Sequence, residues 1–141
     1  MKSLPFIFAL LLSGCVSSMG WRKMLADDPH PPLSSLPEVA LLKVEDGKVV
    51  TRVTNTMDEP ISYYGYAAGK PATYLEERHF GRWVDTMYTW SGTGLEKRFI
   101  PSKGFQDFSI FEGSSRRKMR TYVILTSEDQ KQESLVLVSG H

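Results

Sequence analysis

The sequence predicts an all-β domain, an antiparallel β-sandwich of about seven to nine short strands. From residue 38 onward, apolar and β-branched runs alternate with turn residues about every 8–12 positions, which is typical of a sandwich or barrel. No segment there repeats its apolar residues with the 3.6-residue period of an amphipathic helix. Asp46-Gly47 lies between two such runs, and Asp-Gly in this context is a strong hairpin signal.

The individual strands follow from the composition between the turns. Residues 49–54 are β-branched and residues 61–66 are aromatic and β-branched, and both compositions favour strands. Asp46-Gly47 joins the first two strands, and Phe80-Gly81 joins the fourth and fifth. The predicted strands cover residues 39–44, 49–54, 61–66, 73–79, 82–88, 95–100, 105–111, 119–125 and 134–138.

The first fifteen residues differ from the rest of the chain and contain its single cysteine. Lys2 precedes a short apolar stretch, residues 4–12, which runs into Leu12-Ser13-Gly14-Cys15. This order resembles the signal peptides of bacterial lipoproteins. The resemblance implies that residues 1–14 are removed and that the thiol of Cys15 carries a diacylglycerol. Two alternatives stay open: an unlipidated secreted form, and a cytosolic protein with an N-terminal strand that buries Cys15.

Residues 15–37 are predicted to form the lipidated cysteine and a flexible tether. The segment contains four prolines and several serines, and proline fixes φ and removes a backbone donor. Residues 21–25, Trp-Arg-Lys-Met-Leu, interrupt this composition. They fit either a helical turn in the membrane interface or a segment packed on the domain.

Two stretches follow a recognisable order within the predicted domain, residues 38–141. The strand at 49–54 ends in Asn55 and is followed by Pro60-Ile61, and residues 100–105 read Ile-Pro-Ser-Lys-Gly-Phe. Both resemble bacterial immunoglobulin-like domains, and the resemblance covers about residues 38–139. It implies an immunoglobulin-like sandwich and no particular chemistry. Because the chain lacks the cystine pair of antibody domains, Trp83 is not assigned the role of packing on a disulfide.

The charge balance and the residue types argue against several classes of function. Without residues 1–14, 16 of the 17 Lys and Arg residues remain, against 16 Asp and Glu residues. Nucleic-acid-binding proteins carry a strongly basic face, so we expect no nucleic-acid partner. Among the histidines only His79 lies inside the predicted domain, and one histidine does not make a typical zinc site. A triad of His79, Asp85 and a serine would lack the Gly-x-Ser-x-Gly turn. We expect no catalysis, metal or cofactor.

Aromatic residues between positions 63 and 90 are the main candidates for ligand binding. In a strand, Tyr64 and Tyr66 share one face while Tyr63 points to the other. One set is expected in the core, and the other could form an exposed surface able to stack on a sugar ring or a peptide. The candidate residues are Tyr64, Tyr66, Trp83 and Trp90. The alternative is that all of them pack within the domain, because cross-strand aromatic pairs stabilise sheets.

A basic cluster, Arg116, Arg117, Lys118 and Arg120, follows a Gly-Ser-Ser turn. It could meet a phosphate-bearing lipid or an acidic partner, or it could be a solvated hairpin tip.

The sequence as a whole predicts a lipid-anchored, non-catalytic binding or assembly module of the bacterial cell envelope. Its expected partners are the membrane, through Cys15, and an envelope protein or polymer. Val16 follows Cys15 in place of the aspartate associated with inner-membrane retention, which points to the outer membrane, facing the periplasm. The alternative function is a carbohydrate-binding domain, which an exposed aromatic row would favour. A small hydrolase is third and would need a pocket holding His79 and a carboxylate.

Overall fold

The computed structural model describes residues 20–88, 93–111 and 117–140. The signal-peptide prediction, Cys15, Trp90 and Arg116 lie outside these residues. The described elements, in chain order, are α2 (Trp21–Ala26), β1 (Glu38–Glu45), β2 (Lys48–Thr54), β3 (Ile61–Ala67), β4 (Lys70–Pro71), β5 (Tyr74–His79), β6 (Arg82–Tyr88), β7 (Glu96–Ile100), β8 (Phe105–Phe111), β9 (Met119–Ser127) and β10 (Glu133–Ser139).

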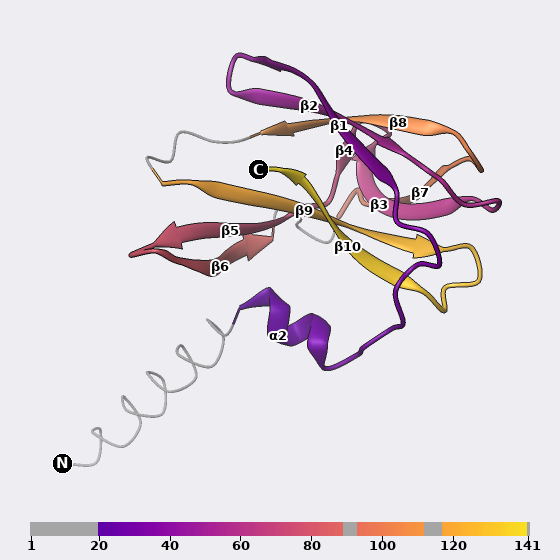
Figure 1. The fold of residues 1–141 in the computed structure, drawn as a ribbon, viewed down its shortest axis with the longest axis horizontal. Coiled ribbons are helices and arrows are strands. Elements are labelled where there is room, and N and C mark those ends of the chain that lie inside the picture. Colours follow the sequence, from indigo (N-terminus) through magenta and orange to yellow (C-terminus); the bar gives the residue numbers. More distant parts are fainter. Residues whose placement is uncertain (1–19, 89–92, 112–116, 141) are drawn as a thin grey trace.

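The strands form two antiparallel sheets, which confirms the predicted all-β sandwich (Figure 1). The smaller sheet has the order β1-β2-β8. The larger sheet has the order β4-β3-β9-β5-β6, with β10 paired to β9 and β7 paired to β3. Strand β9 is central: β10 runs along one edge, while the other edge is shared by β5, at residues 119–122, and β3, at residues 126–127.

Two hairpin turns have the left-handed backbone that their sequences favour. Asp46 and Gly47 join β1 to β2 with φ of 50° and 71°. Phe80 and Gly81 join β5 to β6 with φ of 48° and 79°. Two consecutive positive φ angles match the right-handed twist of the flanking strands, as in a type I′ turn. Asp and Gly are common at such positions, whereas a phenylalanine with positive φ is unusual.

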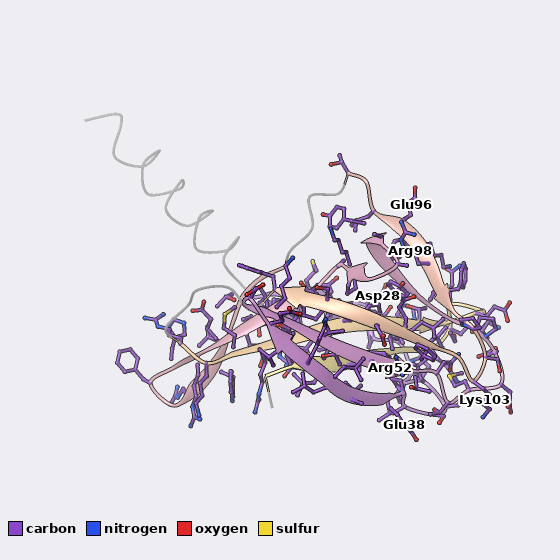
Figure 2. All side chains as sticks on the ribbon, turned by 90° about the horizontal axis from the view of Figure 1, so that it is seen from above. Asp28, Glu38, Arg52, Glu96, Arg98 and Lys103 are labelled. Atoms are coloured by element: carbon purple, nitrogen blue, oxygen red, sulfur yellow. The ribbon has the colours of Figure 1, made fainter. Side chains whose placement is uncertain are left out.

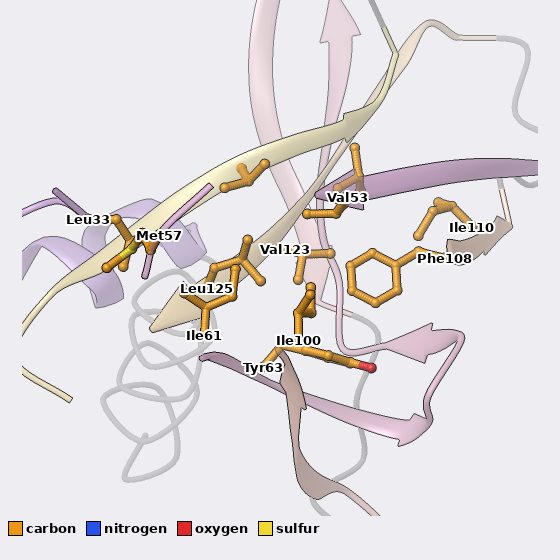
Figure 3. Packing of buried hydrophobic residues seen from close by; sticks show 12 residues of the cluster. Leu33, Val53, Met57, Ile61, Tyr63, Ile100, Phe108, Ile110, Val123 and Leu125 are labelled. Atoms are coloured by element: carbon orange, nitrogen blue, oxygen red, sulfur yellow. The ribbon is translucent and has the colours of Figure 1, made fainter. Parts of the chain in front are cut away.

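The core lies between the two sheets and follows the period-2 pattern of the strands. Along β9, Thr121, Val123 and Leu125 are buried and alternate with partly exposed residues. The Tyr63 ring packs edge-on against Phe108 of the opposite sheet, with 4.9 Å between ring centres. The buried apolar cluster, shown in Figure 3, contains Leu33, Val53, Met57, Ile61, Tyr63, Ile100, Phe108, Ile110, Val123, Leu125, Val136 and Val138.

The segment predicted as a tether packs on the domain in its described part, residues 20–37. Trp21 is only 3 % exposed, and its indole N–H donates to Leu75 O at 2.8 Å. Leu33 belongs to the core cluster, and Glu133 N donates to Pro31 O at 2.9 Å. Burial of these two apolar side chains accounts for the difference from the predicted tether. The free energy gained by burying each of them exceeds the conformational entropy that an extended Pro-rich chain would keep. Of the two interpretations of residues 21–25, packing on the domain is the one observed.

Asn55, at the end of β2, holds together two loops at one end of the sandwich. Its side-chain amide is buried and donates to Glu59 O at 2.8 Å, Pro101 O at 3.1 Å and Ile100 O at 3.2 Å. Its Oδ1 accepts from Met57 N at 2.9 Å. One buried side chain therefore bonds to four backbone groups at this end of the sandwich.

The outer face of the smaller sheet carries both polar and exposed aromatic side chains, and an ion pair joins two of its strands. Arg52 of β2, labelled in Figure 2, donates through Nε to Asp107 Oδ1 of β8 at 2.8 Å. This hydrogen bond lowers the pKa of Asp107. The Arg52 guanidinium also lies 4.0 Å from the centre of the exposed Phe105 ring.

Candidate binding face

The three tyrosines of β3 lie on two faces of the larger sheet. Tyr63 is buried in the core, and its hydroxyl donates to Ala68 O at 2.6 Å. Tyr64 and Tyr66 point to the outer face and are 57 % and 39 % exposed. The sequence required one of these sets to face outward, and the structure identifies Tyr64 and Tyr66 as the exposed set.

Strand β7 adds a third exposed ring beside them. Phe99 pairs with Ser62 and Lys97 pairs with Tyr64, so both side chains share the outer face with Tyr64 and Tyr66. Phe99 is 53 % exposed, and Lys97 Nζ lies 5.8 Å from its ring centre. Tyr64, Tyr66 and Phe99 are called the aromatic row below. The sequence analysis did not select Phe99. A signal was present, because Phe99 lies two residues after Lys97 in a predicted strand and therefore shares the face of that charged residue.

The backbone under the aromatic row is tied down from both sides. Arg98 of β7, labelled with Glu96 in Figure 2, donates to Gly65 O and Tyr66 O, both at 3.2 Å. On the other edge of β3, a Cβ at Gly65 would lie 2.8 Å from Lys70 O. Only glycine fits this close approach of β3 and β4. The row is therefore presented by fixed strands rather than by loops.

A groove of about 310 Å³ adjoins the aromatic row. Tyr64, Tyr74 and Ile124 form its floor on the sheet, while α2 and the chain after it form a wall. His30 Nε2 lies 3.5 Å from Asp28 Oδ2, and Glu133 adds a second carboxylate. We call this the α2 groove; it is lined by Met24, Leu25, Asp28, His30, Tyr64, Ala72, Tyr74, Ile124, Thr126 and Glu133. It combines an aromatic face with hydrogen-bonding and acidic groups.

Two consecutive residues hold α2, the wall of this groove, in place. The Trp21 ring packs on Tyr74 and Tyr122, with centres 5.3 Å and 5.8 Å apart. Arg22 forms a hydrogen-bonded ion pair with the buried Glu76 carboxylate, and its backbone N–H donates to Asp85 Oδ2 at 2.9 Å.

Burial alone would lower the pKa of the Arg22 guanidinium. The hydrogen bond to Glu76 and the nearby charge of Glu76 outweigh that effect, so the pKa of Arg22 is raised and its guanidinium stays charged.

Trp83 lies apart from the aromatic row, on the part of the larger sheet formed by β5, β6 and β9. The guanidinium of Arg120 covers its ring at 3.9 Å, and that of Arg78 lies at 6.0 Å. Trp83 is half-buried under these cations. Trp83 therefore belongs with part of the predicted basic cluster, so among the described candidates it does not share a surface with Tyr64 and Tyr66.

The other described residues of the predicted basic cluster, Arg117 and Lys118, lie beside the β5–β6 hairpin. Arg117 Nη1 donates to His79 Nδ1 at 2.8 Å and lies 3.7 Å from Glu77 Oε2. His79 Nε2 lies 3.1 Å from the same carboxylate. Lys118 is exposed, and its carbonyl accepts from Arg78 N at 2.9 Å.

The groups considered for catalysis do not assemble. His79 contacts Glu77 and Arg117, whereas the carboxylate of Asp85 contacts Arg22. In the described ranges, no three His, Cys, Asp or Glu side chains are grouped so that they could hold a metal ion. Within the same residues, no helix has the length and apolar character needed to cross a membrane.

Comparison of the chain with protein-family models, with curated proteins and with solved structures gave no match.

Proposed function

We propose that this protein is a non-catalytic binding module of the bacterial cell envelope, lipid-anchored through Cys15 and located at the outer membrane, facing the periplasm. The observation that carries the binding role is the aromatic row beside the α2 groove. Three large rings on fixed strands are exposed although the core is filled by other side chains. Such surfaces are costly to leave in water and mark interaction sites. Its partner is an envelope protein or an envelope polymer.

Carbohydrate binding is the second candidate, and the α2 groove favours it. Sugar rings present apolar C–H faces that stack on aromatic rings, and hydroxyl groups that need hydrogen-bond partners. Tyr64 supplies the ring, while Asp28, Glu133 and Thr126 supply acceptors in the same groove.

Replacement of Tyr64 by alanine is expected to abolish most binding to envelope material while changing the melting temperature by less than about 2 °C. The ring is more than half exposed, so its loss leaves no cavity. Retention of the Cys15→Ser chain and of its Tyr64→Ala derivative would be measured on purified cell-wall polymer and on envelope proteins separately.

Val44→Ala is the matched control, because Val44 is at least as exposed as Tyr64 but lies on β1 of the other sheet. Equal retention of the Tyr64→Ala and Val44→Ala variants would refute a binding role for the aromatic row. Retention on the polymer alone would select the carbohydrate function.

Replacement of Cys15 by serine is expected to release the protein from membranes and to prevent labelling by a radioactive fatty acid. This prediction rests on the resemblance of residues 1–15 to a lipoprotein signal peptide. The loss of membrane binding should be large, because stable anchoring takes more than one acyl chain and all of them depend on Cys15. Label that persists in the serine variant would disprove lipidation at Cys15.

A further inference from the structure

The tip of the β5–β6 hairpin carries the most exposed apolar side chain described in the structure. Phe80 has 105 % of its reference exposed area, so its ring is as accessible as in an isolated chain. Its φ of 48° lies in the left-handed region, which is unfavourable for a non-glycine residue. Because the ring is fully exposed, it contributes little to the fold. A residue of this kind is explained by a contact made outside the domain.

Basic residues lie next to Phe80 in the hairpin and on the chain segment beside it. Arg78 and Arg82 flank it on the two strands, and the hydrogen bond from Arg78 N to Lys118 O places Arg117 and Lys118 alongside. Residues 77–84 and 117–119 contain four Lys and Arg residues and one acid, Glu77, which gives a net charge of +3 with His79 neutral. We call these four cations the basic collar. The apolar tip and the basic collar are complementary to a surface whose outer layer is negatively charged and whose interior is apolar.

We propose that the β5–β6 hairpin docks on an anionic lipid surface, with Phe80 inserted among the headgroups and the basic collar against the lipid phosphates. Aromatic rings and Arg or Lys side chains are favoured at this depth of a bilayer. A protein partner fits less well, because a single ring at a hairpin tip offers far less than the roughly 800 Å² per partner of a standard interface. A lipid surface needs only the inserted ring and the opposite charge.

The chain path places the hairpin on the side from which the N-terminal segment enters. A Cβ at Gly20 would lie 2.4 Å from Asp85 Cβ, and Asp85 is on β6, the strand that leads away from the tip. Cys15 is five residues earlier, and five residues span at most about 18 Å. A membrane that holds Cys15 is therefore within reach of the hairpin. The docking itself does not require the acyl chain, so it can fail or succeed independently of the proposed anchor.

The single cysteine makes a direct test possible. In the full chain, Cys15→Ser combined with Phe80→Cys leaves one thiol for an environment-sensitive fluorophore. With vesicles of phosphatidylglycerol and phosphatidylcholine we expect a blue-shifted, brighter emission that a headgroup-depth lipid quencher reduces. Vesicles of phosphatidylcholine alone should give little change. Arg78→Gln and Arg82→Gln should each weaken vesicle partitioning about fivefold, because one basic residue near an anionic surface contributes that factor.

A second labelling site controls for adsorption by the N-terminal apolar stretch. Val44→Cys in the same Cys15→Ser background places the probe on β1, where it should keep the emission of a water-exposed fluorophore. A probe at position 80 that stays in water on both kinds of vesicle would overturn the proposal and leave a protein partner for the tip. Equal responses at positions 80 and 44 would also overturn it, because binding would then not be directed by the hairpin.

Discussion

Replacement of Trp21 by alanine is expected to lower the free energy of unfolding by about 3–5 kcal/mol. Trp21 is almost fully buried between Tyr74 and Tyr122, and its indole N–H is bonded to Leu75 O. The substitution opens a cavity on the sheet and removes the shorter of the two side-chain hydrogen bonds to that carbonyl, leaving the one from Thr86 at 3.3 Å. It also loosens Arg22, whose partner Glu76 would then be a buried carboxylate without its cation.

Urea denaturation of the full chain would measure this loss, with Met24→Ala as the control. Met24 is on the same helix but is substantially exposed, so its replacement should cost less than about 1 kcal/mol. A Trp21→Ala variant no less stable than Met24→Ala would show that α2 does not contribute to the fold. For the same reason a fragment of residues 38–141, which lacks Trp21 and Leu33, is expected to be less stable than residues 20–141.

Replacement of Asn55 by alanine is expected to cost about 3–4 kcal/mol, since it removes the buried amide that donates to Glu59 O, Ile100 O and Pro101 O and the oxygen that accepts from Met57 N. Chemical denaturation of the variant and the parent would give the difference directly.

Asn55→Asp separates hydrogen bonding from side-chain size. The aspartate keeps the acceptor for Met57 N but replaces the donor with a carboxylate oxygen that faces carbonyls, so at neutral pH it should be at least as destabilising as alanine. A loss below about 1 kcal/mol for Asn55→Ala would show that water replaces the amide at this site.

The sequence predicted the strands well because they depend on local signals. Each predicted strand is present within two residues at either end, and both hairpin turns lie where Asp46-Gly47 and Phe80-Gly81 indicated. Strand β4 was missed because it consists of Lys70-Pro71 alone, too short for any periodicity. It exists only because the chain turns back on β3 at residues 68–69, after the end of that strand.

Contacts between distant segments could not be predicted in the same way. The partners of Trp21 are on β5 and β9, more than fifty residues along the chain, and a proline-rich composition concealed the packing of that segment. Likewise, Arg120 covers Trp83 only because β9 pairs with β5 and β5 with β6. For the candidate site, the alternation in β3 predicted that Tyr64 and Tyr66 share a face, but the orientation of that face depended on the assembled sheet.

The central position of β9 means that the larger sheet can assemble only after β9 has paired with strands far earlier in the chain. Its pairing with β3 joins Ile61 to Ser127, and its pairing with β5 joins Tyr74 to Tyr122. Long-range antiparallel pairing of this kind forms slowly, because the intervening chain must close before the contacts stabilise it. The larger sheet therefore cannot be completed until residues 119–127 are free to pair with both β3 and β5.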